Sequence, residues 1–85
     1  MLRVELGNPA KRFLKSCDPI LIARLVACME SLAIDPFPSG VVRVKDRGEK
    51  TFRVRVGKYR IVYTVDHGSN LLLVTDIDKR SRVYK

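Results

Sequence analysis

Arginine recurs at close intervals in a part of the chain that otherwise has the composition of β-strands. The stretch TFRVRVGKYRIVYTV, residues 51–65, carries Arg53, Arg55 and Arg60 among β-branched and aromatic residues. Guanidinium groups bind phosphate oxygens through paired hydrogen bonds, so arginines gathered on one surface indicate an anion site. Arginines on the outside of a strand also serve solubility alone, and the spacing by itself leaves both interpretations open.

The register of the predicted hairpin decides whether these arginines meet. Side chains alternate across a strand, so the apolar residues take one face and the arginines take the other, where they reach solvent. If residues 57–58 form a two-residue turn, Val56 pairs with Tyr59 and Arg55 lies across from Arg60. Like charges opposed in this way are destabilising, and a bound anion that uses both would explain the arrangement.

A second basic segment, residues 78–85, ends the chain. It contributes these residues: Lys79, Arg80, Arg82, Tyr84 and Lys85. A frayed basic tail is one interpretation, because such tails are common at chain ends. In a meander, however, the preceding strand lies beside residues 59–65, so the segment could return across the arginine-bearing face.

The spacing of apolar residues predicts the strands and helices that must position these residues. Residues 2–6 alternate as a first strand. Asn8 as N-cap then predicts a short helix from Pro9 to Ser16, and Asp18 repeats the same capping chemistry for a second helix. The second helix has an apolar stripe with Arg24 and Glu30 outside it. The stripe consists of Ile22, Leu25, Val26, Met29, Leu32 and Ala33.

After the Pro- and Gly-containing loop 35–40, the pattern changes to strands. Four β-branched or aromatic runs are separated by turn-forming residues: VVRVKD, TFRVRV, YRIVYTV and LLLVTDI. We therefore expect a two-layer α+β domain with an N-terminal strand, an αα-hairpin and an antiparallel meander of three to four strands. With 85 residues, the chain predicts a single domain, residues 1–85.

The composition of the chain indicates which kind of partner it binds and which kinds of site it lacks the residues to form. Lys and Arg total 17 against 9 Asp and Glu, a formal net charge of +8, which favours a polyanionic partner such as nucleic acid. Two cysteines and one histidine support neither a zinc site nor a disulfide framework. Without a signal peptide or a membrane span, we expect a cytoplasmic protein that needs no metal or other cofactor.

Taken together, the βαα start, the centre FRVRVGKYRIVY and the end KRSRVY resemble the RelE/ParE superfamily of toxins from toxin–antitoxin systems. The terminal tyrosine is closer to the RelE branch. That resemblance implies a RelE-like toxin domain, ribosome-dependent cleavage of messenger RNA in the ribosomal A site and inhibition of translation. It also implies metal-independent endoribonuclease chemistry, giving 2′,3′-cyclic phosphate and 5′-hydroxyl ends, and a RelB-like antitoxin in a hetero-oligomeric complex.

The resemblance also implies roles for single residues. Arg53 and Arg55 match the basic pair around the scissile phosphate, and Arg60 matches the arginine that stabilises charge on it. Arg80 matches the position implied in leaving-group protonation or phosphate binding, and Tyr84 the one that stacks on or orients the nucleotide. The remaining residues are assigned to RNA binding: Lys45, Lys58, Lys79, Arg82 and Lys85.

One departure leaves the general base open. RelE-like toxins often carry lysines in the basic pair, whereas arginine does not lose its proton in proteins. Tyr84, Lys45, Lys58 or Lys79 could serve, or the ribosomal RNA could contribute. Three alternatives to a nuclease remain: a ParE-like inhibitor of DNA gyrase, a nonenzymatic RNA-binding module and an inactive family member.

Overall fold

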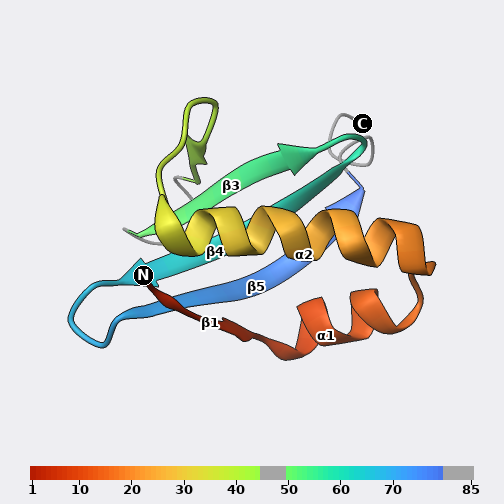
Figure 1. Ribbon diagram of the computed structural model, residues 1–85, viewed down its shortest axis with the longest axis horizontal. Helices are drawn as coiled ribbons and strands as arrows, with labels where there is room; N and C mark the ends of the chain where they lie inside the picture. Colours follow the sequence, from red (N-terminus) through yellow and green to blue (C-terminus); the bar gives the residue numbers. More distant parts are fainter. Residues whose placement is uncertain (45–49, 80–85) are drawn as a thin grey trace.

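A computed structural model describes residues 1–44 and 50–79 and shows one sheet covered on one face by two helices (Figure 1). The elements are β1 (Arg3–Leu6), α1 (Asn8–Lys15), α2 (Pro19–Ile34), β2 (Val42–Arg43), β3 (Thr51–Val56), β4 (Tyr59–Asp66) and β5 (Leu71–Lys79). The strand order is β1-β5-β4-β3-β2. Strands β2 to β5 form the predicted antiparallel meander, and β1 adds in parallel to β5. The predicted two-layer α+β fold is confirmed.

The helical hairpin begins and turns close to the predicted positions. Asp18 caps α2, because its Oδ1 accepts a hydrogen bond of 2.9 Å from the backbone N–H of Leu21. The prediction of Asn8 as N-cap is wrong by one residue: Gly7 is the N-cap of α1 and makes no side-chain hydrogen bond. Gly7 donates its N–H to the Val74 carbonyl at 2.7 Å. Helix α1 therefore begins immediately after the pairing of β1 with β5 ends.

The core lies between the helices and the covered face of the sheet. Leu25 and Leu32 of α2 are buried against Ile61, Tyr63 and Val65 of β4. The alternation predicted for residues 2–6 and for β3 holds as well. Their alternate apolar residues are buried or pack against this cluster: Leu2, Val4, Leu6, Phe52, Val54 and Val56. Burial of these side chains is the main force that holds the two layers together.

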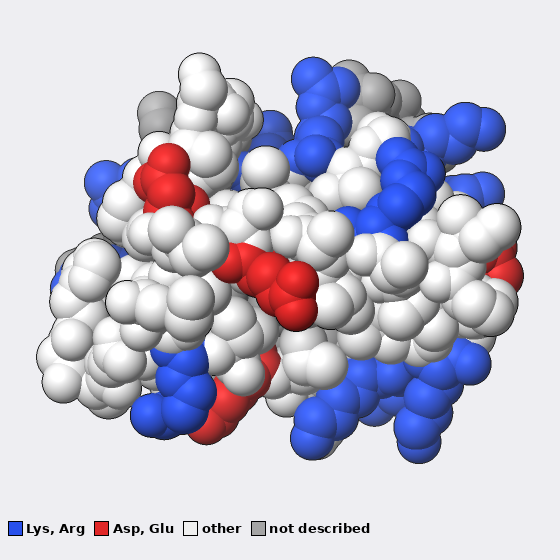
Figure 2. Space-filling model, viewed as in Figure 1, with Lys and Arg blue, Asp and Glu red and all other residues white. Residues whose placement is uncertain are grey.

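Helix α2 is apolar on more than its buried side. Four residues of the predicted stripe are buried: Leu25, Met29, Leu32 and Ala33. Val26, however, is partly exposed, and Ile20 and Ile34 on the outer side are 76% and 70% exposed. The view onto α2 shows mostly uncharged side chains on this face, with acidic side chains among them in the middle and Lys and Arg mainly towards the borders (Figure 2). The prediction of a single core-facing stripe was therefore too simple.

No helix in the described part of the chain is both long enough and apolar enough to span a membrane.

Candidate active site

The β3–β4 hairpin has the predicted register. Gly57 and Lys58 form the turn, Val56 pairs with Tyr59, and Arg55 pairs with Arg60. Gly57 has a φ of 59°, a conformation that glycine adopts without strain and that two-residue hairpin turns favour. The hairpin therefore places both guanidinium side chains on the same rung of the sheet.

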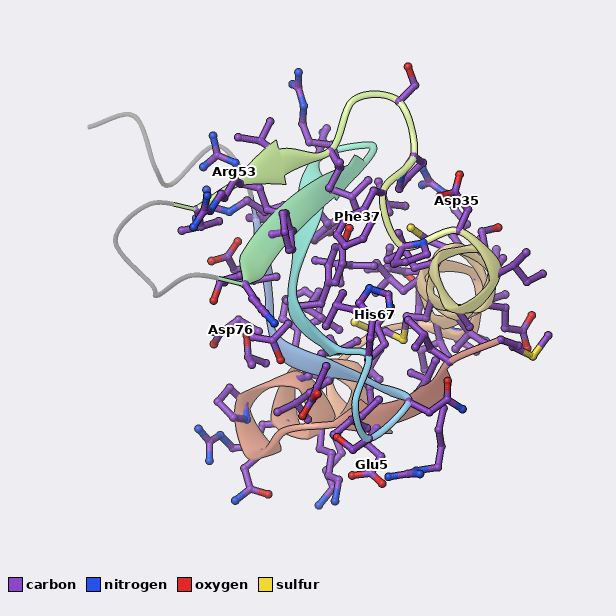
Figure 3. All side chains as sticks on the ribbon, turned by 90° about the vertical axis from the view of Figure 1, so that its left-hand side faces the viewer. Glu5, Asp35, Phe37, Arg53, His67 and Asp76 are labelled. Carbon is purple, nitrogen blue, oxygen red and sulfur yellow. The ribbon has the colours of Figure 1, made fainter. Side chains whose placement is uncertain are left out.

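The arginines project from the face that no helix of the described residues covers. We call this surface the open face and define it by Arg53, Arg55, Arg60, Asp76 and Asp78. Figure 3 shows Arg53 and Asp76 on the side of the sheet away from α2, whereas Phe37 and His67 lie on the helix side. The open face thus combines cations from β3 and β4 with carboxylates from β5.

Arg60 is less exposed to solvent than the sequence predicted. Its Nε donates to Asp78 Oδ1 at 2.9 Å, and its Nη2 makes a longer contact of 3.4 Å to Oδ2. The Arg60 side chain is only 16% exposed, against 43% for Asp78. The prediction that all three guanidinium groups stand in solvent is wrong, because a carboxylate on the neighbouring strand already engages one of them.

An irregularity in β5 is what brings Asp78 to the open face. Val62 pairs with Asp76 but Tyr63 pairs with Val74, so Thr75 is an extra residue in the ladder. Its hydroxyl donates to the Val62 carbonyl at 3.2 Å. Such a bulge shifts the alternation of the strand by one residue.

As a result, Ile77 is buried in the core while its neighbours in the sequence point outward. Two rungs then cross β3, β4 and β5 in the same sense. One runs Arg55, Arg60, Asp78, and the other runs Arg53, Val62, Asp76. Each rung starts with a cation on β3 and ends with a carboxylate on β5.

The other predicted site residues are only partly within the described chain. Lys58 is exposed in the hairpin turn, next to the Arg55–Arg60 rung. Lys79 pairs with Tyr59 at the end of β5 and, by alternation, points to the side opposite Asp78. Five predicted residues lie outside the described residues: Lys45, Arg80, Arg82, Tyr84 and Lys85.

A pocket that the sequence did not indicate adjoins the ion pair. It has a volume of about 450 Å³ and lies between the α1–α2 turn and the ends of β4 and β5. Phe13 and Tyr59, which stack edge to face at 5.8 Å, line its apolar part, and Asp78 and Lys79 line its polar part. Only tertiary packing joins these residues, so no spacing in the sequence could have revealed the pocket.

Tyr63 lies in the hydrophobic core and Cys28 packs against it, so neither is part of the open face. The Tyr63 side chain is buried, and its hydroxyl donates to the Pro36 carbonyl at 2.6 Å. Burial, with the nearby Cys28 and Asp35, raises the pKa of this phenol well above its ordinary value of 10.0. Burial also raises the pKa of the Cys28 thiol, which disfavours its nucleophilic thiolate form.

Among the described residues, neither His67 nor a metal-binding cluster contributes to the open face. His67 is exposed in the β4–β5 turn, and its ring lies 6.2 Å from that of Phe37 on the helix side. Within residues 1–44 and 50–79, no three His, Cys, Asp or Glu side chains are grouped so that they could hold a metal ion. The chemistry available on the open face is therefore that of guanidinium groups and carboxylates.

Comparison with known protein families gives a match over almost the whole chain. Residues 4–84 match the sequence model of a family described as the ParE toxin of the type II toxin–antitoxin system parDE. A curated relative, a toxin designated RelE1 from Methanocaldococcus jannaschii, is 26% identical over 84 residues. That match covers 96% of this chain and 93% of the relative.

Solved structures have the same fold. The archaeal RelE–RelB complex from Pyrococcus horikoshii contains a chain that superposes with a TM-score of 0.81 at 22% identity, covering 96% of this chain and 98% of that one. The toxin–antitoxin complex RelBE2 from Mycobacterium tuberculosis gives 0.79 at 24% identity, with coverages of 93% and 98%. The isolated RelE toxin from E. coli gives 0.78 at 15% identity, with coverages of 93% and 84%.

Proposed function

Because the chain belongs to the RelE/ParE family of toxins from type II toxin–antitoxin systems, we propose that it is an endoribonuclease that cuts messenger RNA in the ribosomal A site. The observation that carries this proposal is the open face, where Arg55 and Arg60 share one rung and Arg53 lies on the next. Phosphoryl transfer needs positioning and charge stabilisation more than it needs a covalent nucleophile. A row of guanidinium groups supplies both.

In the proposed reaction the ribose 2′-oxygen attacks the adjacent phosphorus. The O2′–P bond forms, the P–O5′ bond breaks, the 2′-hydroxyl proton passes to a base and the departing 5′-oxygen takes up a proton. Arg55 and Arg60 stabilise the charge that grows on the non-bridging phosphate oxygens, and Arg53 holds the neighbouring backbone. The products are a 2′,3′-cyclic phosphate and a 5′-hydroxyl.

Further residues complete the proposed site, and all of them except Lys58 and Lys79 lie outside the described part of the chain. On the strength of the family resemblance, Arg80 protonates the leaving group or binds the phosphate, and Tyr84 stacks on the substrate nucleotide. Lys45, Lys58, Lys79, Arg82 and Lys85 contribute contacts to RNA. The base remains one of the groups named above, because arginine cannot accept the proton.

The proposed partners are the ribosome with its messenger and a cognate antitoxin. The P. horikoshii and M. tuberculosis relatives are toxin–antitoxin complexes. With a net charge of +8, this chain favours an antitoxin segment that is acidic or amphipathic. Such a segment inhibits cleavage if it covers the open face or displaces the C-terminal residues.

Primer extension on a defined messenger tests the proposal. The purified toxin is incubated with that messenger alone and with programmed ribosomes. We expect discrete cuts only with ribosomes, and downstream fragments that polynucleotide kinase labels without prior phosphatase treatment, as 5′-hydroxyl ends require. A messenger left intact on programmed ribosomes would contradict the proposal, and salt-sensitive binding without cuts would indicate an RNA-binding module.

A second candidate function is inhibition of DNA gyrase, because the matching family is described as the ParE toxin. It needs no nuclease chemistry. Supercoiling of relaxed plasmid by purified gyrase distinguishes the two: inhibition by this protein together with an intact messenger would favour the ParE type. Unimpaired supercoiling with ribosome-dependent cuts would favour the RelE type.

A further inference from the structure

The ion pair between Arg60 and Asp78 neutralises a guanidinium that is mostly buried in the sheet. Arg60 is mostly buried and lies directly across from Arg55. A buried guanidinium is costly unless it is paired, and opposed like charges on neighbouring strands are destabilising. Asp78 lies on the other side of Arg60 in the same rung and supplies the opposite charge.

The hydrogen bonds to Asp78 use only one edge of the Arg60 guanidinium. The Asp78 carboxylate takes the Nε–Nη2 edge of Arg60, with contacts of 2.9 and 3.4 Å. A guanidinium has a second edge, between Nη1 and Nη2, that can bind another oxyanion bidentately. Arg60 can therefore hold Asp78 and a phosphate at the same time, one on each edge.

We propose that Asp78 is a positioning residue, which fixes the Arg60 guanidinium so that its second edge and Arg55 bind one phosphate. This inference rests on the proposed function of the open face. Asp78 acts through Arg60 and need not touch the RNA. The bulge at Thr75 places Asp78 on the open face, because a regular strand would turn Asp78 to the helix side.

The proposal separates two effects of Asp78 that have opposite signs. Holding Arg60 in place favours the transition state, so loss of Asp78 lowers kcat. Its negative charge repels RNA, so the same loss leaves KM unchanged or lowers it. A merely structural role would lower thermal stability and the fraction of active protein without lowering the kcat of the molecules that remain folded.

The first test does not require RNA cleavage. In the protein labelled with ¹⁵N, the Nε–Hε group of Arg60 gives a signal whose exchange with solvent slows when it is hydrogen-bonded. We expect Asp78→Ala to speed that exchange by about tenfold or more, and Asp78→Glu to restore part of the protection. Glu30→Gln is the control, since it removes one negative charge from the exposed side of α2. Unchanged exchange in Asp78→Ala would overturn the proposal.

The second test uses cleavage on programmed ribosomes. We expect Asp78→Ala to lower kcat about tenfold without raising KM, and Glu30→Gln to match the wild type. In an Arg60→Ala background, Asp78→Ala should not lower kcat further, because Asp78 acts on kcat through the guanidinium already removed. Independent, multiplying losses in the double variant would overturn the proposal.

Failure of the inference and failure of the proposed function are distinguishable. If the wild type does not cleave RNA, the function is wrong, and the exchange measurement still decides whether Asp78 holds Arg60. If the wild type cleaves and the double variant shows independent losses, the function stands and the positioning role falls.

Discussion

The two faces of β4 differ in what their side chains contact. On the helix side, Ile61, Tyr63 and Val65 are buried under α2, and the one polar group among them, the Tyr63 hydroxyl, is satisfied by a backbone carbonyl. On the open face, Arg60 has a like charge on one neighbouring strand and an opposite charge on the other. One strand therefore carries both the core and the proposed chemistry, and substitutions on its two sides should separate stability from activity.

The largest expected effect is on the helix side. Leu25→Ala removes a fully buried side chain from α2 and leaves a cavity against β4. We expect the free energy of unfolding to fall by about 3 kcal/mol and Tm by more than about 10 °C, measured by thermal and urea denaturation. If the free energy of unfolding fell by less than about 1 kcal/mol, the burial of Leu25 in the core between α2 and β4 would be contradicted.

The open face should respond in the opposite way. Arg55→Ala removes an exposed guanidinium that opposes Arg60. We expect cleavage on programmed ribosomes to fall by about thirtyfold, which corresponds to about 2 kcal/mol of transition-state stabilisation. Stability should stay within about 0.5 kcal/mol of the wild type, or rise as the like-charge pair disappears. If the free energy of unfolding fell by as much as the transition-state stabilisation, the proposed functional difference between the two faces would be contradicted.

Tyr63→Phe is a smaller change on the helix side. It removes the hydroxyl bonded to Pro36 and should cost about 1 kcal/mol at neutral pH. Because burial raises the pKa of this phenol, its contribution is present below its ordinary value of 10.0 and is lost as pH rises above that value. Denaturation followed from pH 8 upward should therefore show a steeper alkaline decline in the wild type than in Tyr63→Phe. Parallel declines would contradict the assignment.

The smallest expected effect lies in the β4–β5 turn, away from both sets of contacts. Asp66 accepts hydrogen bonds from the Ser69 hydroxyl at 2.7 Å, from the Ser69 N–H at 3.4 Å and from the Gly68 N–H at 3.0 Å. The two bonds from Ser69 are the main reason that the pKa of the Asp66 carboxyl is lowered. Its contribution is present above the ordinary value of 3.8 and is lost as pH falls below it. Asp66→Asn should be slightly less stable than the wild type at pH 7, and the difference should disappear in acid. A difference that persists in acid would point to another cause.

Local patterns in the sequence were sufficient for the hairpin. Alternation and a two-residue turn fixed the pairing of Arg55 with Arg60, and cap chemistry located the start of α2 at Asp18. Both features depend on residues that are close in sequence, so the patterns that predict them are local.

The ion pair of Arg60 and Asp78 could not be foreseen in the same way. It depends on the bulge at Thr75, which changes the face of every later residue in β5. One signal was present: the apolar residues Leu72 and Val74 are two apart, but the next buried residue, Ile77, follows after three. A regular strand would not have that spacing.

The most direct test of the central claim compares the same substitution on the two sides of the molecule. Arg60→Ala removes a guanidinium from the open face, and Arg12→Ala removes one from the exposed side of α1. Both variants lose one positive charge, and thermal denaturation is used to check that each is folded. Single-turnover cleavage of messenger on programmed ribosomes is then measured for both. We predict that Arg60→Ala loses about a hundredfold or more in rate while Arg12→Ala cleaves like the wild type. Equal rates in the two variants would contradict the claim that the open face carries out the cleavage.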